Sequence, residues 1–408
     1  MKSDRSKKLF LIFLGISVLI FGWFGSSAGE VGVTDTTIKI GSIYDTTGIT
    51  AHWGLARTEA HRAYLNYIND QGGINGRKII QVHENDEYKP SRTVLSYKKL
   101  LDVDKVFCFI SGWGAPTTDA VVPIAEKNKV PYIFFSGNNP SYLWPVRRYI
   151  FPIWPLYEDY PRILVDYIAK DLKMKNAKIA YLAHVGPSGR ATKRGLEYQM
   201  AKYPGMKILA SDLIKYGQVD MGPPVYKMRQ ANPDVLLIFT VLTHTAKILK
   251  EMQKVGWKPS AVMLNPSSGD PKLMKLAGAA AEGVMLEFVF PMVESEMPGV
   301  KFYKDVCRKY LPNSKINPSQ AGIVGFIEMQ LGLEAIKRSG RNLTREGLID
   351  TLENSFKNVD LQSIPPVTYS PEKHWGLNQN LILKVEGGKF KQLTDWRAPE
   401  GGEVQWKQ

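Results

Sequence analysis

The sequence predicts an α/β protein made of two doubly wound, Rossmann-like lobes with a ligand cleft between them. Short apolar segments alternate with segments of helical apolar spacing through residues 37–283. Such alternation is typical of parallel sheets that carry helices on both faces. The alternation forms two successive series, which part near residues 150–152 without a long Gly/Ser linker. In sheets of this kind, ligands bind at the carboxyl ends of the strands, next to helix N-termini.

The first series contains four predicted strands and three predicted helices. Runs of apolar and β-branched residues predict the strands, at residues 38–43, 78–82, 106–111 and 131–135. Apolar residues at helical spacing predict the helices, at residues 55–71, 91–101 and 116–128. The first helix stops at Gly72-Gly73, since glycine favours a helix C-terminus, and Pro116 suits the first turn of the third.

The second series repeats the pattern and then gives way to a different one. Helices are predicted at residues 157–172, 190–203, 219–231 and 244–255, and strands at residues 178–183, 207–213, 235–240 and 261–264. After Gly283 an apolar run reaches Phe290, and helices are predicted at residues 300–311, 320–339 and 344–355. Thr344 is placed to cap the last of these helices. A β-rich segment is expected over residues 366–392.

Residues 1–28 have the three parts of a secretory signal peptide. A basic start precedes the apolar run 9–24, and small residues at 26–28 suit a signal peptidase. The run is shorter than the ~20 residues that a membrane-spanning helix needs, and an uncleaved N-terminal anchor is the alternative. Cleavage near Gly29 would place the mature chain in the periplasm.

Composition excludes several classes of protein. The 408 residues are 44% hydrophobic and 11% aromatic, so the chain can bury proper cores and is not expected to be disordered. The formal net charge is +14, but the cations are scattered along the chain. Because no helix-turn-helix pattern or basic–aromatic stripe occurs, nucleic acid is not an expected partner.

Catalysis is not expected either. The 6 histidines show no metal-ligand spacing, and neither a nucleophile elbow nor a phosphate loop occurs. We therefore predict no enzyme activity, no metal and no cofactor. Cys108 and Cys307 lie in apolar patterns and are expected to be buried free thiols, with one long-range disulfide as the alternative.

Several short motifs occur in the order and spacing of a known family. Residues 67–77 read YINDQGGINGR, and the segment IKIG at residues 38–41 precedes Thr46-Thr47-Gly48. FSGNNP at residues 135–140 and AGAAAEGV at residues 277–284 follow. With these motifs the chain resembles the periplasmic binding proteins of branched-chain amino-acid ABC transporters, the leucine/isoleucine/valine-binding family of the type I fold. The resemblance covers residues 37–340 or so.

The resemblance implies a monomer whose two lobes are joined by three crossing segments, near residues 150–153, 284–290 and 362–368. The lobes would close on a ligand, and the closed form would dock on a membrane permease. The expected organisation is a signal peptide (1–28), an N-terminal lobe (29–150 and 284–361), a C-terminal lobe (151–283 and 362–398) and a polar tail (399–408).

In the first lobe, the resemblance implies that the loop of residues 112–118 holds a ligand carboxylate. We expect Trp113, Ala115 and Thr117 to contact the ligand. Backbone N–H groups at a helix start attract an anion, and the hydroxyls of Thr117 and Thr118 can donate as well. The family has a run of serines here, which Ala115, Pro116 and Thr117 replace.

Two other first-lobe positions match ligand-contacting positions of the family. Trp53 matches an aromatic residue that lies over the ligand side chain. Gly137 and Asn138 form the loop after the next strand, where backbone and amide groups could bind the ligand. A simple turn also explains this loop, since Asn-Asn-Pro suits one.

The second lobe departs from the family. Ser188, Arg190, Thr240, Asn265 and Ser267 are expected to line the cleft. The family often carries an aromatic residue in the loops that hold Ser188, Arg190 and Thr240. It also has an acidic residue near positions 265–268 that binds the α-ammonium of an amino acid. This chain has neither. A carboxylate or amide without an α-ammonium, aromatic or longer-chain, is therefore expected to bind better than leucine, isoleucine or valine, unless Asp45 supplies the missing charge.

The predicted function is that of an extracytoplasmic solute-binding protein. It would deliver a small molecule, an amino acid or a related carboxylate or amide, to the permease subunits of an ABC transporter in the inner membrane. Ligand binding would shift an open–closed equilibrium that the permease reads. The alternative is a ligand-sensing protein of the same fold that signals to a receptor.

Overall fold

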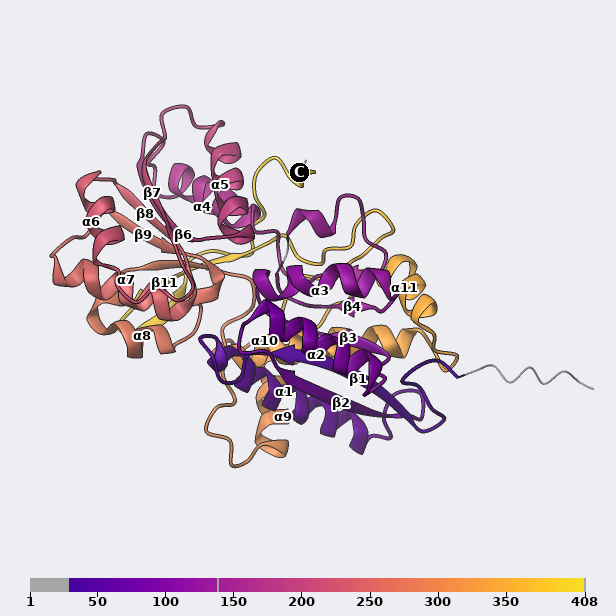
Figure 1. Ribbon diagram of the computed structural model, residues 1–408. Coiled ribbons are helices and arrows are strands. Elements are labelled where there is room, and N and C mark those ends of the chain that lie inside the picture. The colour runs from indigo at the N-terminus through magenta and orange to yellow at the C-terminus, as the bar shows by residue number, and fades with distance from the viewer. Residues whose placement is uncertain (1–28, 138, 407–408) are drawn as a thin grey trace, which may run out of the picture.

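The computed structural model describes residues 29–137 and 139–406, so the predicted signal peptide and Asn138 lie outside the described residues. Figure 1 shows two lobes, each with a sheet covered by helices. In the described residues, one sheet has five strands in the order β2-β1-β3-β4-β5, and the other has seven in the order β12-β11-β10-β9-β8-β6-β7. The predicted α/β class with two doubly wound sheets is confirmed.

The five-stranded sheet of the first lobe is parallel throughout. Successive side chains along each strand point to opposite faces of the sheet, so they pack into two cores, one on each face. Ile110 packs against α10 on one face, and Phe109 stacks on Tyr97 of α2 on the other, at 4.1 Å. The strands are β1 (Thr37–Tyr44), β2 (Lys78–Asn85), β3 (Cys108–Ile110), β4 (Tyr132–Ile133) and β5 (Ile150–Phe151). The helices are α1 (Ala51–Asp70), α2 (Pro90–Asp102), α3 (Ala115–Lys127), α9 (Pro298–Tyr310), α10 (Gln320–Arg338) and α11 (Arg345–Asn354).

The seven-stranded sheet of the second lobe is parallel from β7 to β10. At its other edge, β11 is antiparallel to β10, and β12 is antiparallel to β11. The antiparallel pairing of β11 and β12 is expected of strands joined by a tight turn. The strands are β6 (Lys178–His184), β7 (Lys207–Ile214), β8 (Val235–Phe239), β9 (Ala261–Leu264), β10 (Met285–Phe288), β11 (Leu381–Glu386) and β12 (Lys389–Gln392). The helices are α4 (Asp159–Lys170), α5 (Pro187–Met200), α6 (Gly222–Gln230), α7 (Leu242–Lys254) and α8 (Lys272–Ala277). Short 3₁₀ helices among the described residues are η1 (Pro140–Tyr142), between β4 and β5 of the first lobe, and η2 (Pro266–Ser268) and η3 (Gly278–Ala281) in the second lobe.

The predicted helices recur in the structure, as do the predicted strands up to residue 264, with ends that differ by a few residues. The segment expected to be β-rich over residues 366–392 contains strands only from Leu381 onward. Thr344 caps α11 as expected, since its hydroxyl oxygen accepts the N–H of Gly347 at 3.0 Å. β5 and α8 were not predicted as separate elements, because both are shorter than the windows in which periodicity can be recognised.

The second crossing segment begins later than expected. The prediction assigned residues from 284 onward to the N-terminal lobe, but β10 pairs with β9 and β11 in the seven-stranded sheet. The apolar run at its start is therefore a buried strand, and the chain leaves the second lobe only after Phe288.

The third crossing segment also lies elsewhere. Residues 362–368 fold back on the first lobe, where Val359 and Val367 exchange two backbone hydrogen bonds of 2.9 and 3.0 Å. The chain crosses after Tyr369, whose ring meets Phe151 of β5 edge-on at 5.3 Å. The predicted position, 362–368, was therefore wrong.

The observed crossing runs beside the first one. The N–H groups of Gly376 and Leu377 donate to the carbonyls of Pro152 and Ile153, at 3.0 and 2.8 Å. The first and third crossing segments are thus hydrogen-bonded to each other.

The C-terminal residues are more than the polar tail expected at 399–408. The Arg162 guanidinium of α4 donates to the carbonyls of Glu400 and Gly402, at 3.1 and 2.9 Å. Trp406 is only 5% exposed and lies edge-on to Tyr198 of α5, at 5.1 Å. The segment therefore packs onto the second lobe (Figure 1).

Both cysteines are buried and free, as favoured by their apolar patterns. Burial raises the pKa of each thiol to about 12. Neither thiol is therefore ionised near neutral pH, which makes both unreactive.

Candidate functional site

A cavity of about 40 Å³ lies between the two lobes. Most of its wall comes from the carboxyl ends of strands in both sheets, the place where doubly wound folds bind ligands. The lining residues are Tyr88, Trp113, Gly114, Ala115, Ser136, Trp154, Tyr157, Tyr160, His184, Ser188, Thr192, Tyr216, Phe239, Thr240, Val241, Asn265 and Ser267.

The first-lobe wall is the loop that leads from β3 into α3. Gly114 has a φ of +95°, which suits glycine, and a Cβ at this position would collide with the ring of Tyr88. The close approach places Trp113 and Ala115 on the cavity wall. Because α3 starts here, its first N–H groups have no partner within the helix and its positive dipole end faces the cavity.

A buried ion pair supports this wall from behind. Arg57 and Glu328 are both fully buried, and their side chains lie 3.3 Å apart. The guanidinium of Arg57 lies 4.6 Å from the ring centroid of Trp113. Glu328 accepts hydrogen bonds from Nε1 of Trp154, at 2.9 Å, and from the hydroxyl of Ser111. One carboxylate thus holds Trp154 directly and Trp113 through Arg57.

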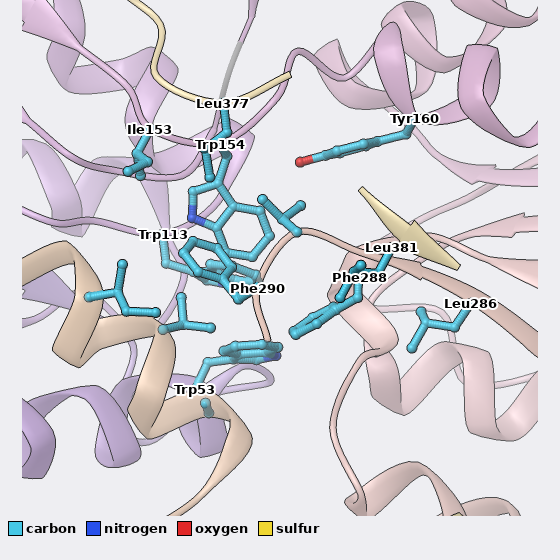
Figure 2. Close-up of a cluster of buried hydrophobic side chains, with 14 of the residues drawn as sticks. Trp53, Trp113, Ile153, Trp154, Tyr160, Leu286, Phe288, Phe290, Leu377 and Leu381 are labelled. Carbon is cyan, nitrogen blue, oxygen red and sulfur yellow. The ribbon is translucent and has the colours of Figure 1, made fainter. Parts of the chain in front are cut away.

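The two cavity tryptophans are part of a larger aromatic cluster at the hinge (Figure 2). Trp113 stacks on Trp53 at 4.8 Å and meets Trp154 edge-on at 5.4 Å. Trp154 lies in the first crossing segment and contacts Phe290 of the second at 4.9 Å. The cluster therefore joins the cavity wall to the first and second crossing segments.

The second-lobe wall contains a histidine that is held neutral. Nε2 of His184 accepts the N–H of Val241 at 3.1 Å. Nδ1 lies 3.0 Å from the carbonyl oxygen of Ile214, to which it donates its proton. This pairing leaves the proton on Nδ1. Burial lowers the pKa of His184 to about 4, so the imidazole carries no charge at pH 7. Tyr216 stacks on it at 4.1 Å.

The two lobes touch each other at the cavity. The ring of Tyr88, from the first lobe, meets that of Tyr216, from the second, at 5.5 Å. Tyr88 has a φ of +58°, uncommon for a large side chain. The carboxylate of Asp86 fixes this turn by accepting the N–H of Tyr88 at 2.9 Å.

Acidic groups near the cavity are either bound elsewhere or set back from it. Asp45 accepts the N–H and the hydroxyl of Thr50, at 2.8 and 2.9 Å, so it organises the loop before α1. Asp270 accepts the N–H of Lys272 at 2.8 Å. Asp119, on α3, does not line the cavity. Its negative charge contributes, after burial, to raising the pKa of Tyr157, which does line it. Burial raises the pKa of Asp119 itself to about 7.

Six of the predicted site residues line the cavity together. They are Trp113, Ala115, Ser188, Thr240, Asn265 and Ser267. Trp53, Thr117, Gly137 and Arg190 do not line it, and Asn138 lies outside the described residues. Trp53 is 1% exposed beneath Trp113, so it reaches the cavity only through that ring.

The predicted hydroxyl donors are engaged by the backbone. The Thr117 hydroxyl donates to the carbonyls of Trp113 and Gly114, and the Thr118 hydroxyl donates to Gly114 at 2.7 Å. The N–H of Thr118 donates to the carbonyl of Gly114 as well, at 3.0 Å. Such bonds to the preceding turn are common for threonine in helices.

Aromatic residues of the second lobe were missed. The two loops expected to lack a ring do lack one, but Tyr157, Tyr160, Tyr216 and Phe239 bring rings from other elements. Phe239 ends β8 and Tyr216 follows β7, so the strand-end rule could have found them. Tyr157 and Tyr160 could not be found in this way, because they follow a crossing segment whose path the sequence does not show.

The described residues contain no group of three or more His, Cys, Asp or Glu side chains that could hold a metal ion. Over the same residues, no helix has the length and apolar character of a membrane span.

The cavity lies between two doubly wound lobes, next to the crossing segments that join them. This arrangement defines a two-lobed receptor for a small molecule. The model of the periplasmic binding protein family matches residues 37–389, and the chain belongs to this family.

Relatives and solved structures agree with this assignment. The Leu/Ile/Val-binding protein homolog 7 of Brucella suis biovar 1 (strain 1330) is 22% identical over 340 residues, which cover 80% of this chain and 82% of the relative. A branched chain amino acid ABC transporter protein from Thermus thermophilus with bound valine has a TM-score of 0.81 at 22% identity, covering 90% of this chain and 98% of its own. A fatty acid ABC transporter substrate-binding protein from Thermomonospora curvata also reaches 0.81, at 24% identity and with 91% and 95% covered. Likeness at these identities shows the fold.

Proposed function

We propose that this protein binds a small carboxylate or amide between its lobes and delivers it to the permease of an ABC transporter. The observation that carries the proposal is the cavity itself, which lies at the carboxyl ends of both sheets and at the start of α3. Both structural relatives named above are proteins of ABC transporters, which supports the delivery step. The protein acts as a monomer and catalyses no reaction.

The mechanism follows from the size of the cavity. A volume of about 40 Å³ holds only about three water molecules, so a larger ligand enters when the lobes part at the hinge. Parting breaks the contact between Tyr88 and Tyr216. A ligand that contacts both walls then favours the closed form, and a permease that binds the closed form can distinguish loaded from empty protein.

The proposal is tested by a thermal-shift screen of the mature protein against a panel of metabolites. A ligand at about 100 times its Kd adds about 2.7 kcal/mol to the stability of the folded state. For a chain of this size we expect the Tm to rise by roughly 5 °C. Small-angle scattering with the same compound should show a smaller radius of gyration, because the lobes close. A panel that shifts neither quantity would contradict the proposal.

Export is the second part of the proposal, and it rests on the basic, apolar and small-residue order of residues 1–28. Mass spectrometry of protein from the native cell envelope should show an N-terminus near Gly29, in the periplasmic fraction. Intact chain in the inner membrane would instead indicate an uncleaved anchor.

A further inference from the structure

We propose that the cavity selects a carboxylate that carries a planar ring and no ammonium group. This inference rests on the proposed function and narrows it to a class of ligand. Three features of the cavity carry it: its aromatic walls, its anion-binding end and the absence of charge among its described lining residues.

The walls are aromatic on both sides. Trp113 and Tyr88 belong to the first lobe, and Trp154 to the hinge. Opposite them, the second lobe contributes a further group of rings: Tyr157, Tyr160, Tyr216 and Phe239. Flat side chains on facing walls suit a flat ligand, because each offset or edge-on aromatic pair contributes about 0.5–1.5 kcal/mol beyond the area that it buries.

One end of the cavity suits an anion. The 13-residue helix α3 begins there, at Ala115, and offers N–H groups and a positive dipole end. A second observation points to a ligand at this place. Trp113 is 7% exposed, and within the described residues its Nε1, a donor that a carboxylate can accept from, has no hydrogen-bond partner. Leaving a buried N–H without an acceptor destabilises the protein, and a ligand carboxylate would supply the missing acceptor.

An ammonium group finds no counter-charge there. None of the described side chains that line the cavity is an acid or a base that is charged at pH 7, and His184 is held neutral. Burying an ammonium without a partner costs several kcal/mol. Contact with the aromatic faces returns only part of this cost. Asp119 is the acid that could respond, but it does not line the cavity, and burial raises its pKa to about 7, which disfavours its charged form.

Four compounds separate the ring from the ammonium. They are 3-phenylpropanoate, L-phenylalanine, 4-methylpentanoate and L-leucine, titrated calorimetrically into the mature protein at pH 7. We expect 3-phenylpropanoate to bind tightest. L-phenylalanine should bind at least about 100-fold more weakly because of its ammonium. 4-Methylpentanoate should bind about 3- to 10-fold more weakly because it lacks the ring, and L-leucine should be the weakest.

The outcomes distinguish this inference from the proposed function. If either amino acid binds as tightly as its deaminated partner, or if none of the four binds, the ligand class is wrong. The proposed function then still stands or falls on the metabolite screen. If 4-methylpentanoate matches 3-phenylpropanoate, the ring is not selected and the inference is equally wrong.

The variant Asp119→Asn provides an independent readout. It should leave the affinity for 3-phenylpropanoate unchanged within about threefold, because that ligand has no cation for Asp119 to meet. A large loss of affinity for L-phenylalanine in the same variant would identify Asp119 as an ammonium partner and would overturn the inference.

Discussion

Replacing Glu328 with glutamine should lower the free energy of unfolding by about 3–5 kcal/mol. The change leaves Arg57 fully buried with no counter-charge, since Glu328 is its ion-pair partner at 3.3 Å. Glutamine keeps an oxygen for Nε1 of Trp154, and its amide N–H can donate to the hydroxyl of Ser111, which in the wild type donates to Glu328. The loss therefore reports chiefly the charge. Chemical denaturation followed by circular dichroism measures it.

Two further variants control for this interpretation. Glu334→Gln, on the same helix, breaks an exposed pair with Arg338 at 2.8 Å and should cost less than about 1 kcal/mol. Combining Glu328→Gln with Arg57→Met removes the unpaired charge and should recover most of the loss. A single Glu328→Gln variant as stable as the wild type would show that Arg57 does not depend on this carboxylate.

Replacing Trp113 with alanine should weaken ligand binding by about 2 kcal/mol or more, which corresponds to roughly 30-fold in Kd. Trp113 lines the cavity and joins the α3 loop to the hinge cluster, so its loss removes contact area from the ligand and support from the wall. Isothermal titration with the compound found in the screen measures the effect, at a temperature where the variant is folded.

Because Trp113 is also a core residue, other variants keep the result interpretable. Tyr216→Ala removes a ring from the opposite wall and should weaken binding as well. Trp257→Ala should leave Kd unchanged, since Trp257 lines a separate groove of about 370 Å³ on the second lobe. Trp53→Ala should chiefly destabilise the fold, by about 3–5 kcal/mol, because Trp53 lies under Trp113. Wild-type affinity in both Trp113→Ala and Tyr216→Ala would contradict the placement of the ligand.

The sequence predicted the fold because its signals are local. Helical and strand periodicity can be recognised within a window of about a dozen residues, and the N-terminal cap at Thr344 requires only its own helix. The crossing segments could not be placed in the same way. The segment near Gly376 is held by the carbonyls of Pro152 and Ile153, more than 200 positions earlier in the chain, and no local pattern encodes that pairing.

The site shows the same division. Trp113 and Asn265 could be identified because each follows a strand, and the strand-end rule applies to any doubly wound sheet. The support behind them could not, because Arg57 and Glu328 are 271 positions apart. A buried ion pair in α1 and α10 looks, in the sequence, like two ordinary charges on two helices.

The measurement that tests ligand binding between the lobes most directly is a crystal structure of the mature protein with the compound that gives the largest thermal shift. We expect the compound between Trp113 and Tyr216, with its carboxylate at the first turn of α3. A compound bound in the groove beside Trp257, with the space between the lobes unchanged, would contradict the assignment of the site.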